Sequence, residues 1–280
     1  MTSSPIAVTG VTGALGGLVA RELAGRGVEQ RLLARSPERA PELPGATAVR
    51  CDYADPGAAV AALAGVGTLF MVSASETEDR VDVHRGFVDA AVAAGVRHVV
   101  YTSFAAAAPD CTFTLGRDHF ATEEHLRASG MATTFLRDNF YLDVFPLFVG
   151  EDDVLRGPAG DGRVAAVARA DVARAAVAVL LAPDDHVGRT HELTGAEALT
   201  LTEVATRIAT ATGRPVTFHD ETVEEAYASR RRWGAPRWQE DAWVSTYTAI
   251  AAGELARSTD AVRALTGRDP LTLDALLAGG

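Results

Sequence analysis

The segment Val8-Thr9-Gly10-Val11-Thr12-Gly13-Ala14-Leu15-Gly16-Gly17 decides the fold of this chain. A short apolar run before it predicts a strand, and the apolar and alanine-rich pattern after it predicts a helix. In such a unit Gly10 permits the sharp turn, Gly13 lets backbone N–H groups approach a pyrophosphate, and Gly16 lets helix and strand pack closely. The spacing is G-x-x-G-x-x-G, whereas dehydrogenases commonly have G-x-G-x-x-G. The segment predicts a dinucleotide-binding loop, with a simple tight turn as the alternative.

Beyond this loop, short apolar or β-branched runs alternate with alanine-rich helical patterns, which is typical of βαβ units around a parallel sheet. Strands are expected at 6–9, 30–34, 47–50, 68–72, 98–102 and 133–137, helices near 14–25, 56–64, 81–94 and 117–129, and helix-ending glycines at Gly27, Gly45, Gly65, Gly95 and Gly130.

The rhythm changes near residue 140, where the expected nucleotide-binding part ends. We predict an α/β fold: a Rossmann-type, doubly wound parallel sheet over 1–150, and a smaller, mainly helical C-terminal substrate-binding region over 151–280. Ala170 to Leu181 is expected to form a helix and Thr190 to Leu193 a strand, so 164–195 should return to the main sheet. A further strand is expected at Val216 to His219.

Charge and composition limit the function. The chain has 280 residues and a formal net charge of −11, and all 26 of its basic residues are arginine. Lysine Schiff bases, P-loop lysines and Tyr-Lys dyads are therefore excluded. Nucleic acid and anionic membranes are poor partners, because they require clustered cations. The dense run Arg230 to Arg232 is expected to be a solvated helix face.

The expected location is a reducing cytoplasm. Cys51 and Cys111 have neither disulfide-scaffold nor metal-ligand spacing, so no metal site is expected. Met1 to Pro5 is short and polar, which does not resemble a signal peptide. The most apolar later stretch, Val164 to Ala182, contains three charged residues and is not expected to span a membrane.

The end of the second strand predicts the cofactor. An NAD-specific protein usually has an acid here for the ribose 2′-hydroxyl, whereas this chain has Arg35 and Ser36. Arg35 can pair with a 2′-phosphate and stack on adenine, with Arg39 one turn further on. We therefore expect NADP(H), although Arg35 could also be an ordinary surface arginine. Asp52 and Tyr53 are expected at the adenine edge, and Ser73-Ala74-Ser75 beside the nicotinamide-side ribose.

The sequence resembles the NmrA-like atypical short-chain dehydrogenase/reductases, in particular the NADPH-dependent quinone oxidoreductase 2 type. The motifs that carry this resemblance cover nearly the whole chain: Thr9 to Gly16, Arg35, Cys51-Asp52-Tyr53, Ala94-Gly95-Val96, Val100 to Ser103, His119 to Glu123 running on to Tyr141, Gly160 to Arg163, Arg169-Ala-Asp171 and His191 to Gly195. The resemblance implies a Rossmann-type domain, a smaller substrate region and NADP(H) in the cleft between them. It implies cofactor contacts from Gly10, Thr12, Gly13, Ala14, Leu15, Gly16, Arg35, Ser36, Asp52, Tyr53, Ser73, Ala74, Ser75, Thr102, His119, Asn139 and Phe140.

One departure from the wider superfamily bears on mechanism. Reductases of that superfamily usually have a Ser and, about a dozen residues later, Tyr-x-x-x-Lys, in which the tyrosine protonates the forming alkoxide. Here Ser103 is present, Leu115 stands at the tyrosine position and His119 at the lysine position. Leucine donates no proton, so carbonyl reduction by the tyrosine route is not expected. His119 is either a ribose contact or a structural histidine, and Ser103 and His119 are kept as candidate catalytic residues.

A quinone needs less proton assistance than a ketone, because its ring spreads the incoming charge over two oxygens. We therefore expect direct hydride transfer from NADPH to a quinone-like or conjugated small molecule. Phe104, Phe140 and Tyr141 are candidates to hold the flat acceptor, and Tyr141 is a candidate catalytic donor; core packing is the alternative.

Two other functions remain open: a non-catalytic redox sensor that reports NADPH/NADP state to a protein, and a reductase or isomerase of a specialised pathway. Trp233, Trp238 and Trp243 are expected to be packing residues, with a lid or acceptor pocket as the alternative.

Overall fold

The computed structural model describes residues 4–279, so most of the expected polar start Met1 to Pro5 lies outside the described residues. The chain forms two compact units, each discontinuous in sequence. Unit 1 comprises Met1–Ser103, Asp118–Arg137 and Ala170–His191, and unit 2 comprises Phe104–Arg117, Asp138–Arg169 and Glu192–Gly280. The chain therefore passes from one unit to the other several times.

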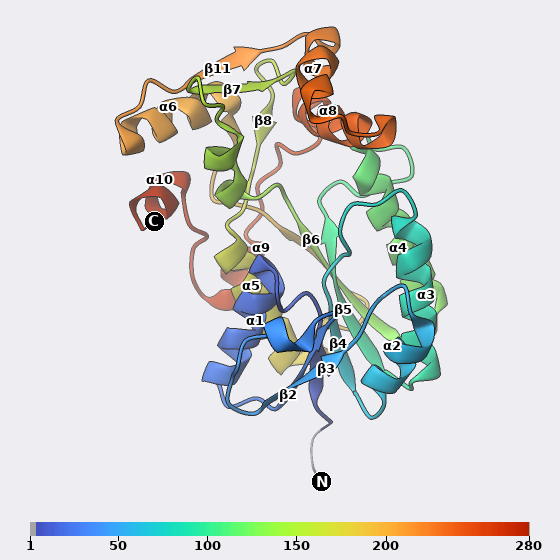
Figure 1. Ribbon diagram of the computed structural model, residues 1–280. Coiled ribbons are helices and arrows are strands. Elements are labelled where there is room, and N and C mark those ends of the chain that lie inside the picture. Colours follow the sequence, from blue (N-terminus) through green and yellow to red (C-terminus); the bar gives the residue numbers. More distant parts are fainter. Residues whose placement is uncertain (1–3, 280) are drawn as a thin grey trace. The chain divides into compact units, whose positions relative to one another are not determined.

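A seven-stranded sheet organises the fold, with strand order β3-β2-β1-β4-β5-β6-β9 (Figure 1). Its strands are β1 (Ile6–Val8), β2 (Gln30–Ala34), β3 (Ala46–Arg50), β4 (Thr68–Met71), β5 (His98–Phe104), β6 (Ala132–Asp138) and β9 (Thr190–Leu193). The pairs β2–β3, β1–β2, β1–β4 and β4–β5 are parallel. The first six strands have the order of a dinucleotide-binding sheet, which reverses between β1 and β4. The predicted Rossmann-type fold is thus confirmed, and β9 joins the main sheet as expected.

The crossover helices are α1 (Ala14–Gly25), α2 (Pro56–Leu63), α3 (Arg80–Ala93), α4 (Thr114–Ala128) and α5 (Arg169–Leu181), with short 3-10 turns η1 (Pro37–Arg39) and η3 (Pro183–His186). Gly27, Gly65, Gly95 and Gly130 follow helices with positive φ, as expected of helix-ending glycines. Gly45 also has positive φ, but it follows a loop rather than a helix, so its expected role was wrong.

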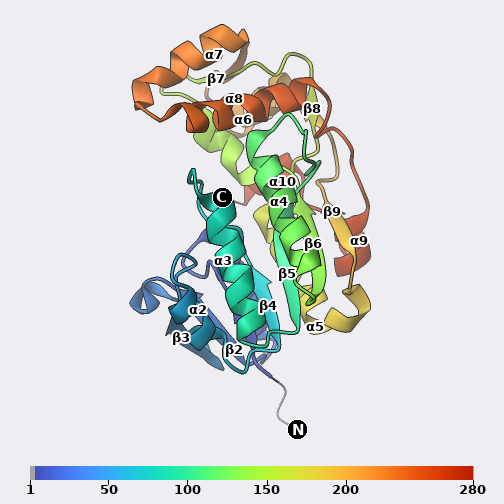
Figure 2. The ribbon, with the colours of Figure 1, turned by 90° about the vertical axis from the view of Figure 1, so that its right-hand side faces the viewer.

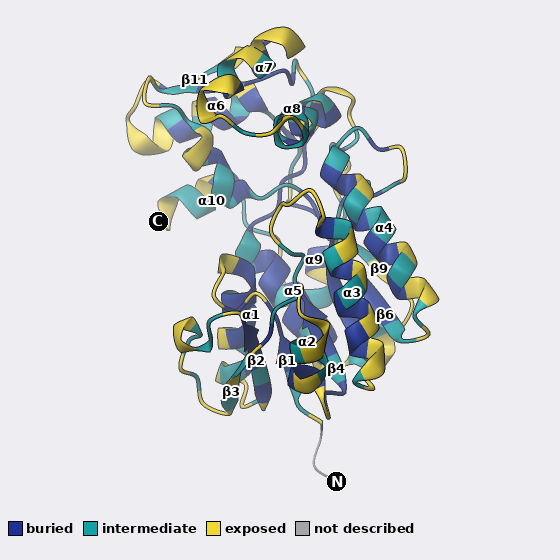
Figure 3. Ribbon diagram, turned by 45° about the vertical axis from the view of Figure 1, so that its right-hand side comes forward, coloured by how far each residue is buried: buried dark blue, intermediate teal, exposed yellow. Residues whose placement is uncertain are grey.

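Helices α2, α3 and α4 cover one face of the sheet and α1 and α5 the other (Figures 1 and 2). The core under α2 and α3 contains fully buried Leu69, Phe87 and Tyr101. In Figure 3 the central strands β1 and β4 are buried, whereas the outer turns of the helices are exposed. Since both faces are covered, the strands read as nearly continuous apolar runs, which is why the sequence revealed them.

Unit 2 contains the remaining elements, of which the sequence located only the strand expected at Val216 to His219. They are η2 (Leu142–Phe148), β7 (Val154–Gly157), β8 (Arg163–Val164), β10 (Leu199–Thr200), α6 (Leu201–Thr212), β11 (Thr217–Asp220), α7 (Val223–Arg230), η4 (Arg231–Trp233), α8 (Arg237–Ala251), α9 (Ala261–Thr266) and α10 (Leu273–Ala278). Strands β7 and β11 pair in parallel and β8 and β10 antiparallel, so two small sheets accompany the helices. Thr200 and Thr222 begin α6 and α7 with complete capping boxes.

Two expectations about unit 2 hold only in part. Arg231 and Arg232 are exposed as expected, but Arg230 is buried, and its guanidinium pairs with Glu221 at 2.8 Å and lies over the Tyr247 ring. Trp233 is 57% exposed rather than packed, although its ring meets the Trp243 ring edge-on at 5.6 Å. Within residues 4–279, no helix combines the length and apolar character that crossing a bilayer requires.

Candidate nucleotide-binding site

The loop after β1 has the geometry that Gly10 and Gly16 predicted. Gly10 has a φ of +65°, and its carbonyl accepts the Gly13 N–H at 2.9 Å, which closes the turn. A Cβ on Gly16 would lie 2.4 Å from the carbonyl oxygens of Thr9 and Gly10, so only glycine fits there. A Cβ on Gly13 would approach the Gly10 oxygen no closer than 3.3 Å, so packing does not by itself demand glycine at this position.

The first turn of α1 is open to a ligand. Thr12, Gly13 and Ala14 are exposed, and Leu15 is buried against the core. Gly13 is the N-cap, and no side chain in the described part of the chain accepts a hydrogen bond there. The N–H groups of a helix start need acceptors, and together with the helix dipole they favour an anion. This end of α1 therefore suits a pyrophosphate.

A closed set of hydrogen bonds ties β1 to β4 beside the loop. The Val72 N–H donates to Thr9 Oγ1 at 2.8 Å, and Tyr53 Oη lies 2.7 Å from both Thr9 Oγ1 and Val72 O. The Thr9 hydroxyl donates to Phe70 O at 3.2 Å, so the single Tyr53 hydroxyl proton is shared between two acceptors, Thr9 Oγ1 and Val72 O. The Tyr53 ring stacks on Phe87 with centroids 3.9 Å apart. Burial raises the pKa of Tyr53.

The chain leaving β4 is held by side chains at three consecutive amides. The Val72 N–H donates to Thr9 Oγ1, the Ser73 N–H to Thr102 Oγ1 at 2.9 Å, and the Ala74 N–H to His84 Nε2 at 2.8 Å. The three acceptors come from the end of β1, from β5 and from α3. Of the predicted residues Ser73, Ala74 and Ser75, the last is exposed and the other two are half-buried.

His119 lies in a buried polar cluster. Its Nε2 is 3.2 Å from Arg80 Nη2 and its Nδ1 is 3.0 Å from Tyr101 Oη. Since arginine only donates, Nε2 accepts, and Nδ1 therefore carries the proton and donates to Tyr101. Burial first, and then the charge of Arg80, hold the pKa of His119 well below its usual value. The imidazole is neutral at pH 7.

Arg35 and Ser36 follow β2 directly, at the carboxyl edge of the sheet. Arg35 and Arg39 are exposed and Ser36 is half-buried, so all three can reach a ligand. Asp52 accepts the Ala54 N–H at 3.1 Å, which shapes the turn after β3. These residues lie at the ends of neighbouring strands, as the prediction required.

Ser103 and Leu115 occupy interior positions. Ser103 is fully buried and donates to Glu123 Oε1 at 2.6 Å, and this carboxylate also receives Arg137 and Arg127. Leu115 lies in the first turn of α4, which begins three residues earlier than predicted, and is 7% exposed. No proton donor therefore stands at the position where the superfamily has tyrosine, and a catalytic role for Ser103 stays a prediction.

The predicted acceptor residues belong to unit 2. The Phe140 ring lies 5.4 Å from that of Phe145 and 6.0 Å from that of Phe148, and the Phe104 ring lies 4.8 Å from that of Phe113. Phe104 and Phe140 are partly buried against one apolar cluster.

Asn139 and Tyr141, which follow β6, form their hydrogen bonds within unit 2. Asn139 is buried, donates to Leu255 O at 3.0 Å and accepts the Phe140 N–H at 2.7 Å. Tyr141 donates to Asp138, with Arg169 over its ring. Burial first, and then the Asp138 carboxylate, raise the pKa of Tyr141 well above its usual value. A catalytic or binding role for either residue stays a prediction.

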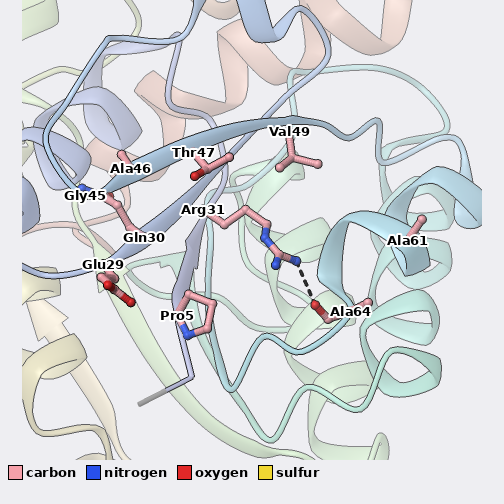
Figure 4. A pocket seen from close by; sticks show the side chains of 10 residues that line it. All are labelled: Pro5, Glu29, Gln30, Arg31, Gly45, Ala46, Thr47, Val49, Ala61 and Ala64. Carbon is pink, nitrogen blue, oxygen red and sulfur yellow. Dashed lines mark hydrogen bonds between the residues drawn. The ribbon is translucent and has the colours of Figure 1, made fainter. Parts of the chain in front are cut away.

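A depression at the opposite edge of the sheet is not the candidate site. It is lined by residues at the start of β2 and just before it, by residues of β3, and by residues around the end of α2 (Figure 4). Its Arg31 guanidinium donates to Ala62 O and Ala64 O, at 2.6 and 2.9 Å, and so satisfies the end of α2. Nucleotides bind at the carboxyl ends of the strands, not here.

Sequence analysis missed Arg80 and His84 as parts of this site, because the expected helix at 81–94 began one residue after Arg80 and did not show their i, i+4 relation on α3. It also missed Thr9 as a scaffold residue. Within the described residues, no group of His, Cys, Asp and Glu could hold a metal ion.

Known proteins share this architecture. A family model described as the NmrA-like family matches residues 2–229. Quinone oxidoreductase 2 of Escherichia coli is 33% identical over 276 residues, covering 96% of each chain. NAD(P)H azoreductase of Xenophilus azovorans is 32% identical, covering 95% of this chain and 94% of its own.

Solved structures agree. The crystal structure of the E. coli NADPH-dependent quinone oxidoreductase with NADPH superposes with a TM-score of 0.88 at 32% identity, covering 98% of this chain and 99% of that one. The family match spans most of the chain, and the fold and the nucleotide loop agree with it. The chain belongs to the NmrA-like family.

Proposed function

We propose that this protein transfers hydride from NADPH to a quinone-like or otherwise conjugated small molecule, without a tyrosine proton donor. Its relatives support this directly as far as the class of enzyme: the chain is an NADPH-dependent oxidoreductase. The observation that carries the proposal is buried Leu115 at the tyrosine position, in a chain that also has an intact nucleotide loop.

The residues present fit NADPH. The uncapped start of α1 offers N–H groups to a pyrophosphate, and exposed Arg35 offers a cation to a 2′-phosphate. Arg35 replaces the acid that would repel this phosphate. The fixed amides of Val72 to Ala74 leave the Ser73 and Ser75 side chains for the nicotinamide-side ribose.

Proton supply distinguishes the acceptors. Bound NADPH supplies a hydride, which is two electrons and one proton nucleus, and the second proton of a hydroquinone comes from water. A quinone stabilises the intermediate charge in its own ring, whereas a ketone needs a general acid. Leu115 cannot act as this general acid, and the Tyr141 hydroxyl already donates its proton to Asp138. The chain therefore favours acceptors that need no acid.

The aromatic residues of unit 2 supply flat apolar contacts for such an acceptor. Phe140, with Phe145 and Phe148 beside it, presents a cluster of rings after β6. Such contacts orient a planar molecule by dispersion and ring electrostatics without requiring charge.

Stopped-flow absorbance at the reduced-nicotinamide band tests the proposal. We expect NADPH to be oxidised with simple quinones and other conjugated acceptors, and not with unactivated ketones. A redox sensor would instead bind NADPH and NADP⁺ with unequal affinity and transfer hydride to none of the panel. That result would refute the proposed enzyme activity in favour of a redox-sensor function.

Two variants examine the mechanism. Leu115→Tyr should leave the quinone rate within about threefold, because proton donation is not limiting. Phe140→Ala should raise KM for the quinone or lower kcat, with NADPH affinity measured in parallel. A large gain from Leu115→Tyr would show that quinone reduction needs a donor after all.

A further inference from the structure

Both backbone groups of Ala74 are bonded to side chains of one helix face. The Ala74 N–H donates to His84 Nε2 at 2.8 Å, and the Ala74 carbonyl accepts from Arg80 Nε at 3.1 Å. Arg80 and His84 are four residues apart on α3 and are 4% and 0% exposed. Burying two polar side chains costs free energy unless each has a hydrogen-bond partner. Here both side chains find a partner on the backbone of the same residue, Ala74.

The protonation of His84 follows from its neighbours. Its Nδ1 is 2.9 Å from Thr122 Oγ1, and the Thr122 hydroxyl donates to Asp118 O at 2.8 Å. Thr122 has no second proton, so His84 Nδ1 donates and Nε2 is free to accept from Ala74. Burial first, and then the charge of Arg80, lower the pKa of His84 to about 3. The imidazole is therefore a fixed, neutral bridge from α4 to the Ala74 amide.

Arg80 makes a second bridge to α4. Its Nη2 donates to His119 Nε2, and its Nη1 lies 3.7 Å from Asp118 Oδ2. Burial raises the pKa of Asp118, and the charge of Arg80 opposes this rise. Two side chains of α3 thus join the segment after β4 to three polar residues of α4, Asp118, His119 and Thr122.

From this geometry we propose that Arg80 and His84 are positioning residues, which hold the segment from Ser73 to Ser75 in the conformation that receives the nicotinamide half of NADPH. The segment leaves β4 where the strand order of the sheet reverses, and this is where a bound dinucleotide crosses from one half of the sheet to the other. The adenine half binds at the ends of β1 and β2, which neither residue contacts through the bonds described above. The inference rests on NADPH binding but not on quinone reduction.

Two ligands and three variants test it. NADPH carries both halves of the dinucleotide, whereas adenosine 2′,5′-bisphosphate carries only the adenosine half. His84→Leu removes the acceptor for the Ala74 N–H, His84→Gln keeps an acceptor near the Nε2 position, and Arg85→Met changes an exposed arginine of the same helix. Calorimetric dissociation constants and thermal unfolding are measured for each protein.

We expect His84→Leu to weaken NADPH at least tenfold, which corresponds to about 1.4 kcal/mol, while the bisphosphate changes less than twofold. His84→Gln should restore NADPH affinity to within threefold of the original, and Arg85→Met should change neither ligand. Equal weakening of both ligands, unchanged NADPH binding, or no recovery with glutamine would each overturn the proposal.

If His84→Leu does not fold, Arg80→Met carries the same expectation, because it removes the bond to the Ala74 carbonyl. Arg80→Met should likewise weaken NADPH binding at least tenfold and change bisphosphate binding less than twofold. A protein that shows this pattern but reduces no quinone would retain the positioning inference and lose the proposed acceptor.

Discussion

Replacing Tyr53 by phenylalanine distinguishes a scaffold role from a direct cofactor contact. The change removes only the hydroxyl, which lies 2.7 Å from both Thr9 Oγ1 and Val72 O, and keeps the ring stacked on Phe87. Each lost hydrogen bond contributes about 0.5–1.5 kcal/mol, and a buried group left without a partner costs about 1–3 kcal/mol. We therefore expect the free energy of unfolding to fall by about 2 kcal/mol.

The assay compares stability with binding in the same protein. Urea titration without nucleotide measures the free energy of unfolding, and calorimetry measures NADPH and NADH. Because the hydroxyl ties together the ends of β1 and β4, both cofactors should weaken by the same factor. Tyr227→Phe is the control, since its hydroxyl donates to Asp241 at 2.7 Å within unit 2 and should leave both affinities unchanged. Weaker NADPH binding with unchanged stability would refute the scaffold role and restore the adenine contact that the sequence suggested.

Four further predictions concern the same unit. Arg35→Ala should weaken NADPH at least about tenfold and barely change NADH, since a charge-assisted hydrogen bond contributes about 1.5–3 kcal/mol; equal losses would refute the 2′-phosphate contact. Gly16→Ala should destabilise the fold, because its Cβ would lie 2.4 Å from two carbonyl oxygens, whereas Gly13→Val should abolish NADPH binding with unchanged circular dichroism. Between about pH 3 and 6.5 the unfolded chain binds a proton that folded His84 does not, so stability should rise with pH by up to about 1.4 kcal/mol per unit from this residue and then level off. His84→Gln should flatten that slope in urea titrations, and an unchanged slope would contradict the lowered pKa.

The alternation of strands and helices was readable from the sequence because it is local. A strand covered on both faces is apolar throughout, and a helix ends where a glycine adopts positive φ, so neighbouring residues suffice to locate β1 to β6 and their helices. Arg35 was readable for the same reason, since it directly follows β2. Between residues 151 and 163 the apolar residues follow no helical or strand periodicity, and strands β7 and β8 were therefore not recognised from the sequence.

Hydrogen-bond partners far apart in the chain were not readable. Tyr53 and Thr9, 44 residues apart, meet only because the strands that they follow, β3 and β1, lie on either side of β2 in the sheet. His84 reads as an isolated histidine until α4 brings Thr122 against it, 38 residues away. The sequence by itself determined the element types, the nucleotide loop and the missing tyrosine, since each depends on residues close together in the chain. Only the tertiary structure decided which polar side chains hydrogen-bond to one another across the fold, because these partners depend on which strands and helices become neighbours when the chain folds.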